Sequence, residues 1–147
     1  MIPHIRWMIR RDMPEVLDIE EQSYQSPWTE EGFLHFLRAR NTIAMVAEHG
    51  EKVVGFMVYE LCAGMLVLHN LAVHPGYLRQ GIGSRLLSKL KTKLCTKRRD
   101  RIILDISDRN ESGHLWLRAN GFKATNVWRN IYSDGRDGYR FMWEVQG

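Results

Sequence analysis

Residues 65–90 read MLVLHNLAVHPGYLRQGIGSRLLSKL, and this stretch decides the fold. The apolar run Met65 to Val73 predicts a buried strand that stops at Pro75-Gly76. After the two glycines at 81 and 83, Ile82, Leu86 and Leu90 recur every four residues, which predicts an amphipathic helix. A strand that passes through a glycine turn into a helix is a building unit of α/β proteins.

The flanking sequence predicts the other elements, in the overall order β-α-α-β-β-β-α-β-α-β-β. A strand over 4–10 precedes a helix that Asp12 caps and that runs to about Tyr24, with Val16, Leu17 and Glu20 at helical spacing. A second helix follows Pro27, with Ser26 or Thr29 as its cap and an apolar stripe of Phe33, Phe36 and Leu37. Two strands then flank His49-Gly50.

The C-terminal part predicts a buried strand over 101–107, a helix over 110–120 that Gly121 stops, and a closing β-hairpin. Hairpins and crossover helices together indicate an α/β fold. We expect a single domain over residues 1–147, with a mixed, mostly antiparallel sheet of about seven strands and about four helices.

The composition is that of a globular domain with an anionic partner. The chain has 147 residues, of which 44% are hydrophobic and 26% charged, so one core of ordinary size can form. Lys and Arg outnumber Asp and Glu by 21 to 17, a net charge of +4. This excess favours an anion but does not separate a nucleic acid from a phosphorylated small molecule.

The two cysteines, Cys62 and Cys95, form neither a disulfide framework nor a CxxC zinc motif, so we expect no metal. The N-terminal stretch MIPHIRWMIRRDMPEV is interrupted by charges and predicts neither a signal peptide nor a membrane span. We therefore expect a cytoplasmic protein with reduced thiols and no membrane partner.

The glycine turn predicts an anion site at the start of a helix. The first backbone N–H groups of a helix have no partners within it, and glycine lets a phosphate approach them closely. Six consecutive residues could wrap a pyrophosphate: Arg79, Gln80, Gly81, Ile82, Gly83 and Ser84. The turn lacks the Gly-Lys-Ser/Thr of a P-loop and the third glycine of the dinucleotide motif. A plain turn before a helix is the alternative.

The stretch LHNLAVHPGYLRQGIGSRLL resembles the acetyl-CoA site of the GNAT N-acetyltransferase superfamily, in which a strand enters a pyrophosphate loop of the form Q/R-x-x-G-x-G/A. Leu78 departs from that pattern, and Arg79 could supply the missing charge. A second stretch, DRNESGHLWLRANGF, resembles a later motif of the superfamily. PWT, NLAV, RQGIG and RNIYSDGRDGYRFM resemble the branch of ribosomal-protein alanine N-terminal acetyltransferases.

The resemblance implies acetyl-CoA as co-substrate and a set of residues that bind it. The strand residues Leu71, Ala72 and Val73 would flank the thioester, with a backbone N–H at its carbonyl. The residues 79–84 would hold the pyrophosphate. Asn110 would contact the pantetheine or phosphate part of the cofactor, although a helix cap also explains its position.

Acetyl transfer to an amine needs a base for the ammonium proton and benefits from an acid at the thiolate. Asp105 lies where the branch has its catalytic Glu, inside the apolar run IILDIS, and burial there would favour proton transfer. A strand-end or turn carboxylate is the alternative. Leu117 replaces the Tyr that serves as acid, which leaves Tyr132 as a substitute. His69, on the strand beside the cofactor, is a further candidate base or a plain strand residue.

These residues predict an acetyl-CoA-dependent N-acetyltransferase whose acceptor is the N-terminal amine of a protein, such as a ribosomal protein. A lysine or a small amine is an alternative acceptor. A catalytically degenerate sensor that binds acyl-CoA is the alternative from another class, since Leu117 cannot donate a proton. Nucleic-acid binding is suggested only by the net charge, and no recognition motif supports it.

Overall fold

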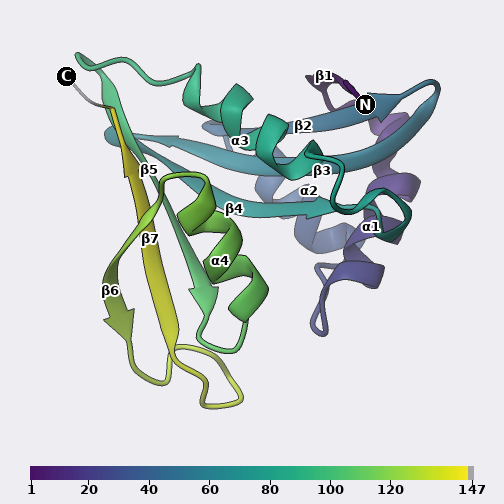
Figure 1. Ribbon diagram of the computed structural model, residues 1–147. Helices are drawn as coiled ribbons and strands as arrows, with labels where there is room; N and C mark the ends of the chain where they lie inside the picture. Colours follow the sequence, from purple (N-terminus) through teal and green to yellow (C-terminus); the bar gives the residue numbers. More distant parts are fainter. Residues whose placement is uncertain (146–147) are drawn as a thin grey trace. The chain divides into compact units, whose positions relative to one another are not determined.

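The computed structural model describes residues 1–145, and its elements follow the predicted order (Figure 1). The helices are α1 (Met13–Ser23), α2 (Glu30–Arg38), α3 (Ile82–Lys91) and α4 (Glu111–Ala119). The strands are β1 (His4–Trp7), β2 (Thr42–His49), β3 (Lys52–Cys62), β4 (Gly64–Val73), β5 (Arg99–Ser107), β6 (Lys123–Trp128) and β7 (Gly138–Glu144). No helix in residues 1–145 is long and apolar enough to cross a membrane.

The seven strands form a sheet in the order β1-β2-β3-β4-β5-β7-β6. The pairs β1–β2, β2–β3, β5–β7 and β6–β7 are antiparallel, and β4–β5 is parallel. The predicted fold class is therefore confirmed: the described residues form an α/β fold with a mixed, mostly antiparallel sheet of seven strands and four α-helices.

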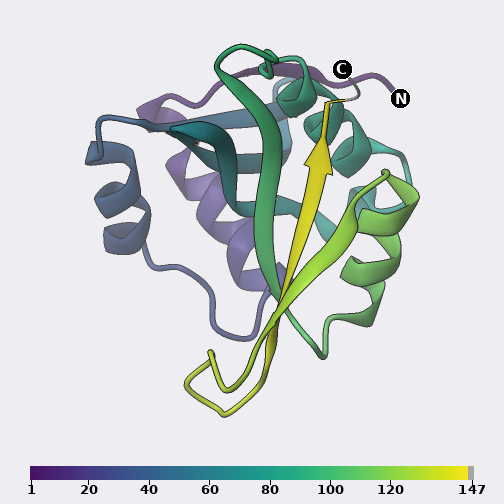
Figure 2. The ribbon, with the colours of Figure 1, turned by 90° about the vertical axis from the view of Figure 1, so that its left-hand side faces the viewer.

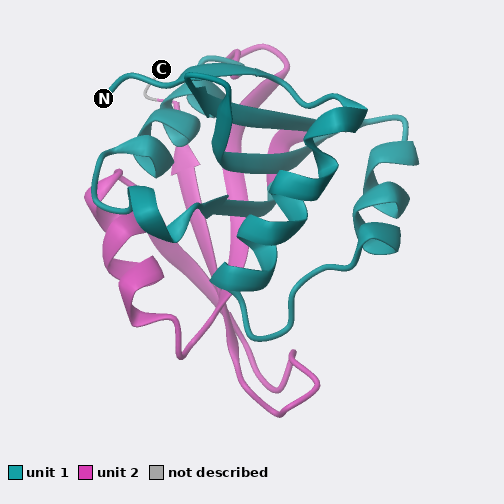
Figure 3. Ribbon diagram, turned by 90° about the vertical axis from the view of Figure 1, so that its right-hand side faces the viewer, with its two compact units in different colours: residues 1–61, 68–93 teal, residues 62–67, 94–147 magenta. Residues whose placement is uncertain are grey.

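The chain divides into two compact units (Figure 3). The first comprises residues 1–61 and 68–93, and the second comprises residues 62–67 and 94–147. Strand β4 passes from the second unit to the first after Val67. The expectation of a single domain over residues 1–147 stays a prediction, and its last two residues lie outside the described part.

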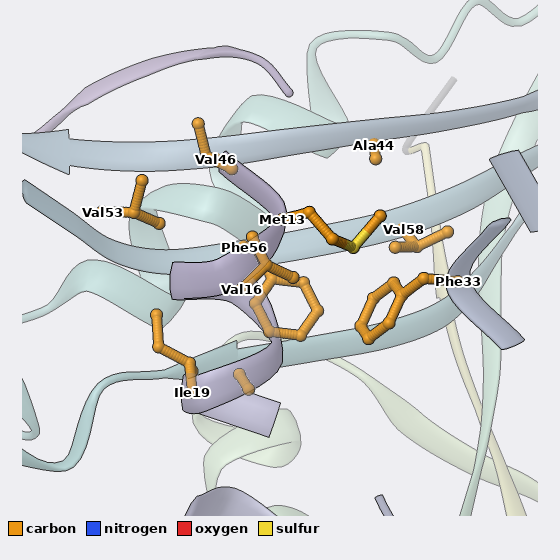
Figure 4. Close-up of a cluster of buried hydrophobic side chains, with 10 residues drawn as sticks. Met13, Val16, Ile19, Phe33, Ala44, Val46, Val53, Phe56 and Val58 are labelled. Atoms are coloured by element: carbon orange, nitrogen blue, oxygen red, sulfur yellow. The ribbon is translucent and has the colours of Figure 1, made fainter. Parts of the chain in front are cut away.

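The core of the first unit forms between the two N-terminal helices and strands β2 and β3. Val16 of α1 and Phe33 of α2 are fully buried and contribute to a cluster with Val46 and Phe56 (Figure 4). The Phe33 and Phe56 rings meet edge to face, with centroids 5.6 Å apart. These contacts explain why both helices have an apolar stripe.

The two N-terminal helices begin differently. The Thr29 side chain accepts a hydrogen bond of 3.1 Å from Gly32 N, so Thr29, and not Ser26, caps α2. Asp12 precedes α1 as predicted, but its carboxylate forms no capping bond to that helix. The carboxylate accepts instead from Ile9 N at 2.8 Å and pairs with Arg6. The prediction of a side-chain cap by Asp12 is therefore wrong, because the arginine of β1 takes the carboxylate.

Besides the start of β4, the second unit contains the β5, β6 and β7 strands and helix α4 (Figure 2). Leu117 and Phe122 are buried, as is Phe141 of the central strand β7. Asn110 caps α4, since its side-chain oxygen accepts from Gly113 N at 3.0 Å. Gly121 follows the helix with a φ of +86°, a conformation that favours glycine.

Candidate functional site

The start of helix α3 has the features of an anion site. Gly81 is its N-cap, with a φ of +79°, and has no side chain that could form a capping hydrogen bond. Arg79, Gln80 and Gly81 are exposed, whereas the Ile82 side chain is buried in the core. The positive end of the helix is thus preceded by a turn in which two residues have left-handed backbone conformations, Gly81 and Arg79, the latter with a φ of 62°.

The end of strand β4 presents alternate residues to its two edges. His74 N donates to Val54 O at 2.8 Å, which directs this end of the chain toward β3. A Cβ added to Gly55 would lie 3.2 Å from Ala72 O, so the Ala72 carbonyl also faces β3. Since successive peptide groups of a strand alternate, the backbone groups of Leu71 and Val73 face the other edge. Ala72 is buried in the core cluster, and its backbone groups face β3. It can therefore support a ligand on the other edge only by packing behind it.

A buried carboxylate joins helix α1 to strand β4, and sequence reasoning missed its role. Glu20 is 1% exposed and accepts from Asn70 Nδ2 at 2.8 Å and from Trp28 N at 2.9 Å. Burial raises the pKa of Glu20, against the effect of these two hydrogen bonds. The available signal was a charged residue in phase with the apolar Val16 of α1.

Tyr24 lies just beyond the end of α1 and contacts the same strand. Its hydroxyl donates a hydrogen bond to the Leu71 carbonyl. Tyr24 is 40% exposed as a whole, but desolvation of its hydroxyl, followed by the negative charge of Glu20, raises the pKa of Tyr24 to about 12. The tyrosine therefore keeps its proton at neutral pH and acts as a donor.

His69 is held by a carboxylate and an aromatic ring. Its Nε2 lies 2.7 Å from Glu60 Oε1 of β3, and its ring packs against Phe36 of α2 with centroids 4.9 Å apart. Phe36 in turn stacks on Trp28 at 4.4 Å. A histidine oriented by a carboxylate has the arrangement of a general base. The sequence pointed to His69 but not to its partner.

Asp105 differs from its expected environment. Ile102, Ile103 and Leu104 are buried as predicted, but Asp105 is exposed. Its two oxygens accept from Arg140 Nε at 2.9 Å and Nη2 at 3.1 Å. The prediction that the apolar run buries this carboxylate is wrong, because β7 places Arg140 directly opposite and the ion pair lies at the surface.

The other candidates in the second unit are Tyr132, Asn110 and Leu117. Burial, followed by the charge of Asp105, raises the pKa of Tyr132, so its hydroxyl stays protonated. Asn110 uses its side-chain oxygen to cap α4. Leu117 is 1% exposed and contributes only to the core. The first unit thus holds His69, the end of β4 and the start of α3, and the second unit holds Asp105, Asn110 and Tyr132.

Residues 13–122 match the model of the acetyltransferase (GNAT) family. The chain is 28% identical over 128 residues to the ribosomal protein bS18-alanine N-acetyltransferase of Escherichia coli K12, with 86% of each chain covered. It is 27% identical over 143 residues to a putative enzyme of the same name from Bacillus subtilis, with 95% of this chain and 93% of the relative covered. The crystal structure of the Escherichia coli ribosomal-protein-S18-alanine N-acetyltransferase superposes with a TM-score of 0.88 at 23% identity, over 99% and 96% of the two chains.

Proposed function

The chain belongs to the acetyltransferase (GNAT) family. We propose that it transfers an acetyl group from acetyl-CoA to the N-terminal amine of a protein, and that this protein is a ribosomal protein. The start of α3 supplies the observation on which this proposal depends. It follows β4 through a left-handed glycine, has no side-chain cap and exposes Arg79. The acceptor is proposed from the relatives, whose names specify N-acetylation of an alanine of ribosomal protein bS18.

We propose that residues 79–84 hold the pyrophosphate of acetyl-CoA. Backbone N–H groups of the first turn of α3 would donate to the phosphate oxygens, with the Arg79 side chain beside them. The outward-facing peptide groups of Leu71 and Val73 would receive the pantetheine and the thioester, while Ala72 packs behind them. Asn110 would contact the cofactor with the part of its side chain that the helix cap does not use.

The amine attacks the thioester carbonyl, a C–N bond forms, and the C–S bond breaks to release the CoA thiolate. The ammonium proton must first leave, and Asp105 and His69 are the two candidate bases. Asp105 occupies the position that the family resemblance implies, although Arg140 holds its carboxylate. The geometry around His69 suits a base better than that around Asp105, since Glu60 orients the His69 ring. Tyr132 has a protonated hydroxyl and is the proposed proton donor to the thiolate.

The test is mass spectrometry of peptides incubated with the enzyme and acetyl-CoA. One peptide has the N-terminal sequence of bS18 with a free alanine amine. A second has the same sequence with a blocked N-terminus and an internal lysine. We expect one added acetyl group on the first peptide only. Acetylation of the lysine peptide alone would assign another acceptor, and acetyl-CoA binding without turnover on any amine would support the sensor alternative.

A ribosomal acceptor places the proposed reaction in the cytoplasm, where such proteins are made. Fractionation of cells that express the tagged chain tests this placement. Only the net charge of the sequence suggests a nucleic acid as a direct partner, and a filter-binding assay with unrelated oligonucleotides at several salt concentrations would reveal one.

A further inference from the structure

The Tyr24 hydroxyl reaches a backbone group of β4 at the place where the thioester is proposed to lie. It donates to the Leu71 carbonyl, although 47 residues separate the two in sequence. The pairing of β4 with β5 runs from Gly64 to Val67, and Leu71 lies beyond this paired segment. In a regular sheet, a backbone N–H of the neighbouring strand would donate to this carbonyl. Here the Tyr24 hydroxyl donates to it instead.

The N–H and C=O of one strand residue face the same edge. Since Ala72 faces β3, Leu71 N–H faces the edge where the Tyr24 hydroxyl lies. A carbonyl oxygen that accepts from Leu71 N–H is then within reach of that hydroxyl. We propose that Tyr24 is a catalytic residue that donates a second hydrogen bond to the thioester oxygen of acetyl-CoA, beside Leu71 N–H. This inference rests on the proposed function.

The surroundings of Tyr24 hold it in place for this role. Glu20 accepts from Trp28 N and from Asn70 Nδ2, so it fixes both the segment that follows Tyr24 and the residue that precedes Leu71. The Tyr24 backbone N–H donates to Glu20 O at 3.2 Å, which ties the tyrosine to the last turn of α1. Because the ring is fixed before the substrate arrives, only the hydroxyl hydrogen has to turn toward the thioester oxygen, so little reorganisation precedes the stabilisation of developing charge.

The step that Tyr24 assists is the addition to the carbonyl. As the amine nitrogen forms the C–N bond, the electron pair of the C=O bond moves to the oxygen, which becomes an oxyanion. The hydroxyl turns from the Leu71 carbonyl to the thioester oxygen when acetyl-CoA binds, and its hydrogen bond strengthens as that oxygen becomes an oxyanion. The hydroxyl returns to Leu71 when the products leave. Tyr24 keeps its proton throughout: the attacking nitrogen loses its second proton to the base or to water as the amide forms, and the thiolate takes its proton from another donor.

The test compares Tyr24→Phe with Tyr59→Phe. Tyr59 also has a buried hydroxyl, which lies 4.0 Å from Met45 Sδ, so its variant controls for the loss of a phenol oxygen. We expect kcat of Tyr24→Phe to fall by about 10²-fold, the loss typical of one oxyanion donor, with the Kd for acetyl-CoA changed less than about threefold. Tyr59→Phe should keep kcat within about twofold of the wild type.

Infrared spectroscopy of bound acetyl-CoA, labelled with ¹³C at the thioester carbonyl, distinguishes this role from a structural one. Each hydrogen bond to the carbonyl lowers its stretching frequency. We expect the band to move up in Tyr24→Phe and to stay in place in Tyr59→Phe. An unmoved band in Tyr24→Phe, or a kcat equal to that of Tyr59→Phe, overturns the proposal. Failure of the wild type to bind acetyl-CoA would instead overturn the proposed function.

Discussion

Asp105 and Arg140 form a two-point ion pair across strands β5 and β7, with N–O distances of 2.9 and 3.1 Å. Asp105 stands where the family resemblance implies the base, yet a guanidinium occupies both of its oxygens. The guanidinium also lies over the Trp128 ring, 5.1 Å from its centroid, which fixes the orientation of the pair. Bidentate pairs of this kind are geometrically specific, so substrate must either use the carboxylate as it is held or displace the arginine.

The first prediction concerns the role of this carboxylate. If Asp105 accepts the ammonium proton, Asp105→Asn lowers kcat by about 10²–10⁴-fold, because an amide cannot accept it. The affinity for acetyl-CoA should not change, as calorimetry can show. Arg140→Gln is the matched control, since it breaks the pair but keeps the carboxylate, and its kcat should fall much less. Equal losses in both variants would mean that the pair is structural.

The second prediction concerns the other candidate base. His69→Gln removes the imidazole that Glu60 orients, and we expect kcat to fall by about 10²-fold if His69 takes the proton. Glu60→Gln keeps the imidazole and should lose less activity. The control is His35→Gln on α2, which is exposed and contacts the same Phe36 ring from another position. Steady-state kinetics on the acceptor peptide measure all three, and a fully active His69→Gln excludes this residue as the base.

The third prediction tests the phosphate site. Gly83→Val places a branched side chain in the first turn of α3, where it crowds the approach of a pyrophosphate, and should weaken acetyl-CoA binding at least about tenfold, or ~1.4 kcal/mol. Gly32→Val is the matched control, because Gly32 lies in the first turn of α2 and costs a similar amount of helix stability. Calorimetric titration gives both affinities. Unchanged binding in Gly83→Val would move the cofactor away from this turn.

The fourth prediction follows from the raised pKa of Glu20. A carboxyl whose pKa is higher in the folded than in the unfolded state contributes stability that is fully present below its unfolded pKa, which is 4.5 for an ordinary Glu. This contribution is lost as the pH rises through the folded value. The free energy of unfolding of the wild type, minus that of Glu20→Gln, should therefore decrease as the pH rises above about 4.5.

Urea denaturation of the wild type and of Glu20→Gln at pH values from below about 4.5 upward measures this difference in the free energy of unfolding. The contributions of most other titrating groups cancel in the difference. Asp18→Asn on the exposed side of α1 is a suitable control, since the Asp18 carboxylate lies at the surface and accepts a hydrogen bond of 2.8 Å from the Gln22 side chain. A difference that stays flat with pH for Glu20→Gln would show that Glu20 titrates alike in both states.

The fifth prediction separates the two possible caps of α2. Thr29→Ala removes the hydroxyl that accepts from Gly32 N and should lower the free energy of unfolding by about 0.5–2 kcal/mol. Ser26→Ala changes an exposed residue before the helix and should cost much less. Urea denaturation at one pH compares the two. A larger loss for Ser26→Ala than for Thr29→Ala would contradict the observed cap.

The sequence predicted the elements and the family with few errors, because both depend on local patterns. The spacing of Ile82, Leu86 and Leu90 defines a helix face, and all three are buried. Gly81 supplies the positive φ that the turn needs. The prediction of a buried environment for Asp105 failed because that environment depends on a contact between distant segments. An apolar run indicates that a strand is buried on average, but the partner of one side chain depends on the register of another strand.

The sequence by itself determined the strand-turn-helix unit, the order of the elements and the membership in the acetyltransferase (GNAT) family, since periodicity and turn residues act over a few positions. Tertiary structure alone decided which polar groups meet. Asn70 meets Glu20 from 50 residues away, and Arg140 meets Asp105 from 35 residues away. Such partners are fixed only when helices pack and strands pair in register, because a shift of one residue turns each side chain to the other face.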